Sequence, residues 1–237
     1  MHWTDAGFVL SVRKHGETSA IVSLLTHEHG RHAGLVRGGA GRKARAMLQI
    51  GNLVAATWRA RLEEQLGNLA CEPLRAYAAE IMAERLPLLA LSSAAALVDL
   101  SLPERAPHPE VFAEFAVLVD TLTGQGWEPV YVRFELALLS ALGFGLDLET
   151  CAVTGSAENL SHVSPRTGHA VSAGAAAPYR ERLLELPSFL RDPAAARAPG
   201  DLRAGLSLTG HFLKRLLRDT FERDLPSTRV MLADQLS

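Results

Sequence analysis

The segment between residues 31 and 45 has residue types and spacing that favour contact with an anion. It holds five cations and no acidic residue: Arg31, Arg37, Arg42, Lys43 and Arg45. The glycines of the run Gly38-Gly39-Ala40-Gly41 make the backbone flexible, so both backbone and side chains can approach a phosphate closely. The segment therefore predicts a phosphate-binding loop. A merely solvated basic loop is the alternative, and the lack of neighbouring acids favours binding.

Cations elsewhere extend the candidate set. Arg59 follows Trp58 in an alternating stretch, where Trp58 faces either a core or a ligand. Lys214, Arg215 and Arg218 recur near helical spacing and predict a basic stripe on one helix face. Three acidic residues between positions 219 and 224 make surface ion pairing the alternative for this stripe. Its functional interpretation is contact with DNA or with an acidic peptide.

The sequence lacks the patterns that carry catalysis. It has no Gly-x-x-x-x-Gly-Lys loop followed by Ser or Thr, no Gly-x-Gly-x-x-Gly turn and no Gly-x-Ser-x-Gly elbow. His27, His29 and His32 have no Cys or Asp at ligand spacing, so we interpret them as solvated turn residues. Cys71 and Cys151 lack the context of a nucleophile. We expect no cofactor, no metal and no enzymatic activity.

Composition limits the class of protein. A chain of 237 residues with 48% hydrophobic and 21% charged residues is ordinary for a globular protein of one or two domains. The formal charge of −2 excludes a uniformly basic binder, but it is unevenly spread: residues 1–80 carry +3 and residues 81–237 carry −5. The first residues do not form a secretion signal, and the apolar stretch 86–102 is interrupted by Pro and Asp. With two distant cysteines, we expect a protein of the reducing cytoplasm.

Hydrophobic patterning divides the chain into two parts and predicts an α+β fold. Short aliphatic runs separated by glycine turns predict five antiparallel strands, which suit a closed barrel of the OB type. The predicted strands are 7–13, 19–26, 31–37, 52–61 and 68–72. Long Ala- and Leu-rich segments then predict helices at 74–85, 88–102, 109–122, 129–142, 178–186 and 202–222. We place the domain boundary between residues 76 and 77, with an irregular, turn-rich insertion at 143–177.

Several local patterns, in this order and spacing, resemble the bacterial recombination mediator RecO family. They are Gly7-Phe-Val-Leu10, Gly16-Glu-Thr-Ser-Ala-Ile-Val22, Leu25-Thr-His-Glu-His-Gly30, Leu35-Val-Arg-Gly-Gly-Ala40, Tyr131-Val-Arg-Phe-Glu135 with Leu138-Leu139, Leu142-Gly-Phe-Gly-Leu146 and Leu225-Pro-Ser-Thr-Arg229. The resemblance implies an OB-fold that binds single- and double-stranded DNA, followed by a helical domain. It also implies strand annealing and, with the partner RecR, loading of RecA onto DNA coated by single-strand-binding protein, whose acidic tail is a further partner.

The resemblance fails at one element. Many members of the family carry two Cys-x-x-Cys pairs in the insertion, whereas only Cys151 matches here and Thr154, Ser172 and Ala175 occupy the other positions. Hydroxyl and methyl groups do not replace thiolates, so we expect the element to fold without zinc. A site completed by His162 or His169 would be weak. One equivalent of tightly held zinc in the purified protein would contradict this expectation.

An alternative interpretation belongs to a different class of protein. The −5 charge of the helical part favours a protein-interaction adaptor that makes only incidental DNA contact. An annealing assay without partner proteins separates the two classes, because an adaptor does not speed strand pairing.

Overall fold

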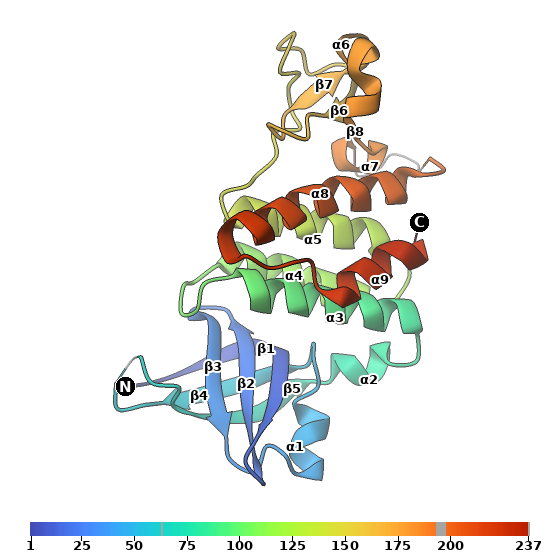
Figure 1. Ribbon diagram of the computed structural model, residues 1–237. Coiled ribbons are helices and arrows are strands. Elements are labelled where there is room, and N and C mark those ends of the chain that lie inside the picture. Colours follow the sequence, from blue (N-terminus) through green and yellow to red (C-terminus); the bar gives the residue numbers. More distant parts are fainter. Residues whose placement is uncertain (63, 193–197, 237) are drawn as a thin grey trace. The chain divides into compact units, whose positions relative to one another are not determined.

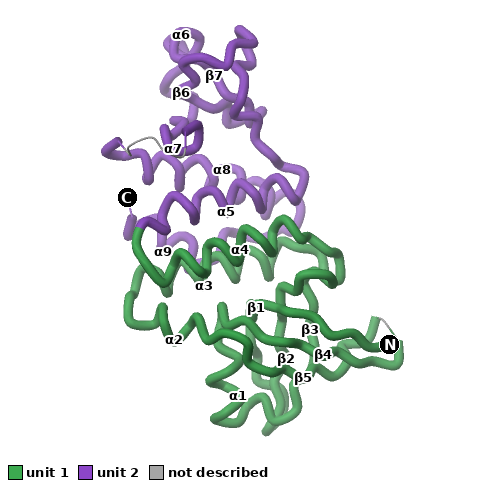
Figure 2. The backbone as a smooth tube through the Cα atoms, turned by 180° about the vertical axis from the view of Figure 1, so that it is seen from behind, with its two compact units in different colours: residues 1–125 green, residues 126–237 purple. Residues whose placement is uncertain are grey.

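The computed structural model describes residues 1–62, 64–192 and 198–236. The chain forms two compact units, residues 1–125 and 126–237, shown in Figure 2. The first unit is a β-barrel with accompanying helices, and the second is mainly helical (Figure 1). The predicted α+β class, with an OB barrel before helices, is confirmed. The predicted boundary at 76/77 concerns separately folding domains and stays a prediction.

Five strands close the barrel in the order β1-β2-β3-β5-β4. They are β1 (His2–His15), β2 (Ser19–Thr26), β3 (Gly30–Val36), β4 (Leu53–Arg59) and β5 (Asn68–Arg75). All neighbours pair antiparallel except β3 and β5, which pair parallel through Leu35 and Asn68. The expectation of five antiparallel strands is wrong at this seam, because strand alternation predicts strands but not their neighbours.

The barrel interior is filled by aliphatic side chains and Trp58. Alternate residues of β4 point inward, so Val54, Ala56 and Trp58 are at most 1% exposed. Leu48, just after the short helix α1 (Arg42–Met47), belongs to the same core. The flexible glycine run expected at residues 38–41 forms a turn, and the six-residue helix α1, which was not predicted, follows it.

Three helices complete the first unit: α2 (Tyr77–Ile81), α3 (Arg85–Ser101) and α4 (Pro109–Thr121). Figure 1 shows α3 and α4 beyond one end of the barrel strands. Phe8 on the outer face of β1 packs against Phe112 and Phe115 of α4, with ring centroids 5.3 Å apart in both pairs. Phe8 is 1% exposed and is therefore a core residue.

The second unit packs around α5 (Trp127–Ala141) and α8 (Asp201–Phe221), followed by α9 (Ser227–Leu236). A buried ion pair joins two of its helices: Arg229 of α9 donates to both carboxylate oxygens of Glu135 on α5, and Thr209 of α8 donates to the same carboxylate. Glu135 and Arg229 stand in two of the patterns that carry the family resemblance. The structure shows that these distant segments meet.

The insertion is more regular than predicted. It contains β6 (Leu160–Val163), β7 (Ala170–Ser172) and α6 (Ala173–Ala176), with a 3-10 helix at Ala177–Arg182, β8 (Leu184–Glu185) and α7 (Ser188–Arg191) following. The three strands form one sheet in the order β7-β6-β8. The helix predicted at 178–186 is wrong, because a 3-10 turn and a strand occupy it. Strands of two to four residues are too short to give a sequence period.

Candidate nucleic-acid interface

A groove of about 730 Å³ runs along the first unit beside the β3–β5 seam. Its walls come from the end of β3, from α1 and from β4 and β5. The floor is apolar and includes Leu35, Met47 and Leu69, whereas Arg37 and Arg59 stand at its edge. The groove exists because β3 and β5 pair at a single position, which leaves their remaining edges apart.

The structure thus brings together two predicted site residues from distant parts of the sequence. Arg37 and Arg59 are both exposed, and both line the groove. The Arg37 Nε donates to the Asn68 side-chain oxygen at 3.1 Å, which holds its guanidinium over the groove. The two cations therefore flank an apolar surface, the arrangement that suits a phosphate chain whose bases face inward.

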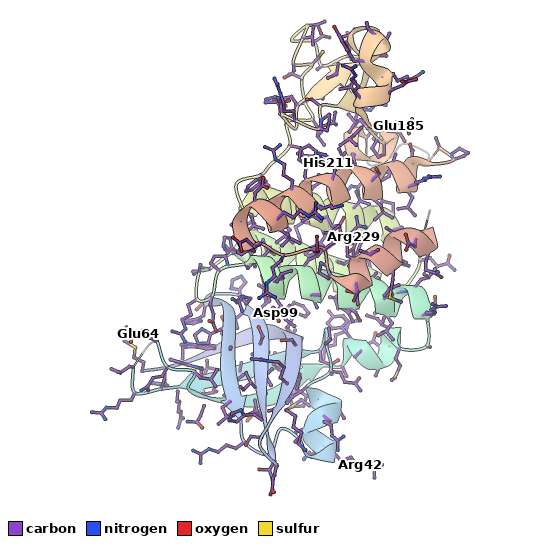
Figure 3. The ribbon with its side chains drawn as sticks, in the orientation of Figure 1. Arg42, Glu64, Asp99, Glu185, His211 and Arg229 are labelled. Carbon is purple, nitrogen blue, oxygen red and sulfur yellow. The ribbon has the colours of Figure 1, made fainter. Side chains whose placement is uncertain are left out.

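Helix α1 carries three further predicted cations, which do not themselves line the groove; Arg45 lines a separate cavity together with Lys14 and Glu17. Arg42, Lys43 and Arg45 are exposed, and the described part of the chain offers none of them an ion-pair partner. Figure 3 shows Arg42 projecting outward from α1. Ala44 and Met47 from the same helix line the groove, so α1 forms one of its walls.

A buried asparagine fixes the end of α1. The Asn52 amide group donates to the backbone oxygens of Ala46 at 3.2 Å and Met47 at 2.9 Å. Its side-chain oxygen accepts the Ala78 N–H at 3.0 Å, which satisfies a free donor at the start of α2. Asn52 is 3% exposed. No sequence pattern singles out Asn52, because its role depends on carbonyls that become free only where α1 ends.

Arg31 lies away from the groove and is bound within the protein. Its Nε donates to the Leu102 oxygen at 2.8 Å, and its terminal nitrogen lies 3.6 Å from the Asp99 carboxylate. Asp99, labelled on α3 in Figure 3, also accepts the Ser23 hydroxyl at 2.6 Å. These contacts favour a structural role for Arg31, although its predicted phosphate contact remains a prediction. Asp99 is too distant in sequence for the charge pattern to reveal it.

The basic stripe of α8 is largely engaged in surface interactions. Arg215 lies 3.6 Å from the Asp219 carboxylate and donates to the Arg166 oxygen at 2.9 Å. Arg218 donates twice to Asp224, at 3.0 and 3.1 Å. Lys214 is exposed and has no ion pair with a residue that the structure describes. The geometry thus favours the ion-pairing alternative for Arg215 and Arg218.

The three histidines near β3 differ from each other. His27 is exposed, as expected. His29 stacks on Trp3 with centroids 4.3 Å apart and lies 3.2 Å from the Asp5 carboxylate. His32 is 4% exposed, so its interpretation as a solvated residue is wrong. The alternation of β3 indicates this burial, because His32, Gly34 and Val36 lie at every second position and share the inward face of the strand.

Cys151 lies among hydroxyl groups in the insertion. Its sulfur accepts the Ser172 N–H at 3.2 Å and lies 3.5 Å from the Ser172 hydroxyl. Hydrogen bonds from Ser172 and Thr154 lower the pKa of the Cys151 thiol to about 6. Within the described ranges no group of three His, Cys, Asp or Glu side chains can hold a metal. Hydroxyls are poor ligands for zinc, so these residues do not fit the zinc site of the family.

Comparison with known proteins agrees with this geometry. A small closed barrel with a basic groove defines an OB-type nucleic-acid-binding protein. The family profile described as "Recombination protein O N terminal" matches residues 1–77, and "Recombination protein O C terminal" matches residues 83–224. No helix among the described residues is both long enough and apolar enough to cross a membrane.

Similar proteins named "DNA repair protein RecO" occur in several bacteria. That of Rhodospirillum centenum is 52% identical, covering 99% of this chain and 94% of the relative. Those of Phenylobacterium zucineum and Cereibacter sphaeroides are 50% and 48% identical over 100% of this chain and 98% and 99% of theirs. The chain belongs to the RecO family of DNA repair proteins.

Proposed function

We propose that this protein binds single- and double-stranded DNA through the groove of its barrel and promotes pairing of complementary strands. One observation carries the proposal: Arg37 and Arg59 flank an apolar groove whose wall, α1, presents three exposed cations. Cations neutralise phosphates, and the apolar floor accommodates bases that are not paired. When two protein-bound DNA strands come close together, their bases can leave the groove and form base pairs with each other.

The family suggests the pathway in which this binding acts. We propose that the protein, together with RecR, helps RecA to load onto single-stranded DNA coated by single-strand-binding protein. The acidic tail of that protein is a chemically suitable partner for a basic surface such as Lys214 on α8. In this role the protein acts in the cytoplasm at the nucleoid. It needs no cofactor and does not act as an enzyme, since it positions strands without making or breaking covalent bonds.

The groove assignment is tested by the salt dependence of oligonucleotide binding. Replacing Arg42, Lys43 and Arg45 by Gln removes three phosphate contacts, and each contact contributes about 0.7 to the logarithmic salt slope for single strands. The slope of log K against log salt is therefore expected to fall by about 2. A gel-shift titration with single-stranded oligonucleotides at several salt concentrations measures it.

A control with the same change in net charge replaces Arg180, Arg182 and Arg203 by Gln. All three are exposed residues of the second unit. This variant is expected to keep most of the wild-type slope. Equal slopes for the wild type and the α1 variant would refute the groove assignment.

An annealing assay with the protein alone tests the adaptor alternative. The observation that favours an adaptor is the charge of −5 on residues 81–237. We expect the wild type to speed pairing of complementary strands and the α1 variant to lose most of this effect. Wild-type protein that binds partner proteins without speeding annealing would support the adaptor instead.

A further inference from the structure

A second cavity, of about 320 Å³, opens at the end of the barrel where β3 begins and β4 ends. Three nearly parallel rings stand there. Trp3 stacks on His29 at 4.3 Å and lies 5.9 Å from Trp58, with interplanar angles of 13° and 17°. His32 stands edge-on to both indoles, at 4.9 and 4.8 Å. We call these four residues and Arg105 the barrel mouth.

His32 is buried, and no described residue forms a hydrogen bond to its ring nitrogens that would compensate for the loss of hydration. Neither of its ring nitrogens has a hydrogen-bond partner among the residues that the structure describes. Burial and the nearby charge of Arg105 lower the pKa of His32 to about 4, so the ring is neutral at neutral pH. A neutral ring has one N–H, which an indole face can accept weakly, and one lone pair, which an electron-rich face repels. At least one buried acceptor thus lacks a donor.

Arg105, which lines the same cavity, has a strained backbone and a side-chain nitrogen that no described residue pairs with. Its φ of 63° lies in the left-handed region, which is costly for a residue other than glycine. The Arg105 N–H donates to the Arg31 oxygen at 2.7 Å, and its Nη2 donates to the Gln65 oxygen at 3.0 Å. Its Nε is buried and has no partner in the described part of the chain.

Close packing holds this strained residue in place. A Cβ on Gly30 would lie 1.8 Å from the Ala106 oxygen, so the segment after Arg105 rests directly on the backbone of the barrel. The protein thus maintains a strained residue beside a buried histidine, and each of the two has an unused polar atom. Strain of this kind is found most often where a ligand is held.

We infer that the barrel mouth binds a single nucleobase, as a site separate from the groove. A nucleobase is a flat ring whose edge carries a hydrogen-bond donor next to an acceptor. The free acceptor of His32 and the free donor of Arg105 match such an edge, and the face of His29 that does not lie on Trp3 offers a stacking surface. Glu28 and the nearby Asp5 give the mouth acidic neighbours, so it selects the base rather than the phosphate.

The occupant follows from the position of the mouth along β4. Thr57 and Arg59 line the groove, and Trp58 between them lines the mouth. Because Trp58 points into the barrel and its two neighbours point away from it, a strand in the groove reaches the mouth around the end of β4, where Arg59 pairs with His2, which lines the mouth. Met1, His2 and Glu28 also line the mouth, and all three are exposed.

Thymidine is the probe that tests this site without engaging phosphate contacts. In a Trp127→Phe background the remaining tryptophans, Trp3 and Trp58, both belong to the mouth and report binding by fluorescence. We expect saturable quenching by thymidine. His32→Phe keeps a ring but removes both nitrogens, and Arg105→Met removes the donor; each is expected to weaken thymidine binding about tenfold or more.

The matched control is the Gln variant of Arg42, Lys43 and Arg45, which is expected to bind thymidine as the wild type does while its salt slope for oligonucleotide binding falls by about 2. The assignment of the mouth and the assignment of the groove can therefore be refuted independently of each other. Absence of quenching at millimolar thymidine would overturn the inference, as would unchanged affinity in either mouth variant. Thermal melting establishes that the variants are folded, and Arg105→Met decides the matter if His32→Phe does not fold.

Discussion

Removal of the positive charge of Arg229 is expected to destabilise the second unit far more than removal of the whole ion pair. Burial opposes the charge of Arg229, but the Glu135 carboxylate outweighs it and raises the pKa of the guanidinium. Arg229 is 2% exposed and Glu135 is 0% exposed. In Arg229→Met the side chain keeps much of its length, and Glu135 retains a single charge-stabilising donor described by the structure, the Thr209 hydroxyl.

The magnitude follows from the contacts that are lost. Arg229 donates to Glu135 at 2.5 and 3.0 Å and to the Leu206 oxygen at 2.8 Å. Breaking one side of a buried pair costs about 3 to 5 kcal/mol, because an uncompensated charge remains. Replacing both Glu135 and Arg229 by Met removes the additional hydrogen bond from Arg229 to the Leu206 oxygen, which keeps its helical partner within α8, and changes the packing, at a combined cost of about 1 to 3 kcal/mol. The double variant should thus recover about 2 kcal/mol relative to Arg229→Met.

Urea unfolding followed by circular dichroism and by fluorescence measures this difference, provided that both signals give the same midpoint. The decisive comparison is between Arg229→Met and the double variant. If the double variant is as unstable as the single one, the destabilisation comes from lost packing and not from a stranded carboxylate, and the reasoning is wrong.

Three further outcomes are expected in the first unit. Asn52→Ala leaves two backbone oxygens and one N–H without their partner, and should lower the free energy of unfolding by about 2 to 4 kcal/mol in urea titrations; a loss below 0.5 kcal/mol would contradict it. Arg31→Gln should lower stability by about 1 kcal/mol while leaving the salt slope of DNA binding unchanged, and a slope reduced by a full phosphate contact would instead support the DNA-contact prediction. Burial raises the pKa of Cys71 to about 12, so in Cys151→Ser protein its alkylation should rise about tenfold per pH unit from pH 7 to 9. Because Cys71 lines the groove, bound oligonucleotide should slow this alkylation, and equal rates with and without oligonucleotide would argue against binding there.

The barrel was largely predictable because its strands alternate and its turns contain glycine. The predicted range 19–26 agrees with β2 at both ends, since the apolar run is bounded by turns on either side. Among the helices that escaped prediction, α1 and α9 did so for different reasons. Helix α1 has six residues and follows a glycine run, and α9 carries its apolar residues around all sides, so neither gives a helical stripe.

The candidate site was predictable only in part. Charge clustering identified the cations of α1, because they are close in sequence and lie on one short segment. The groove itself arises from the parallel pairing of β3 with β5, which no local pattern encodes. For the same reason the Asp99 partner of Arg31 was missed, because the contact depends on how α3 packs on the barrel.

The buried pair of the second unit also orders events during synthesis. Glu135 leaves the ribosome 94 residues before Arg229. At typical elongation rates of about 5 to 20 residues per second, the nascent carboxylate waits roughly 5 to 20 s for its counter-ion. The barrel unit, complete by residue 125, can fold within that interval. The helical unit can reach its final packing only after translation has passed residue 229, and until then Glu135 on α5 lacks its buried counter-ion.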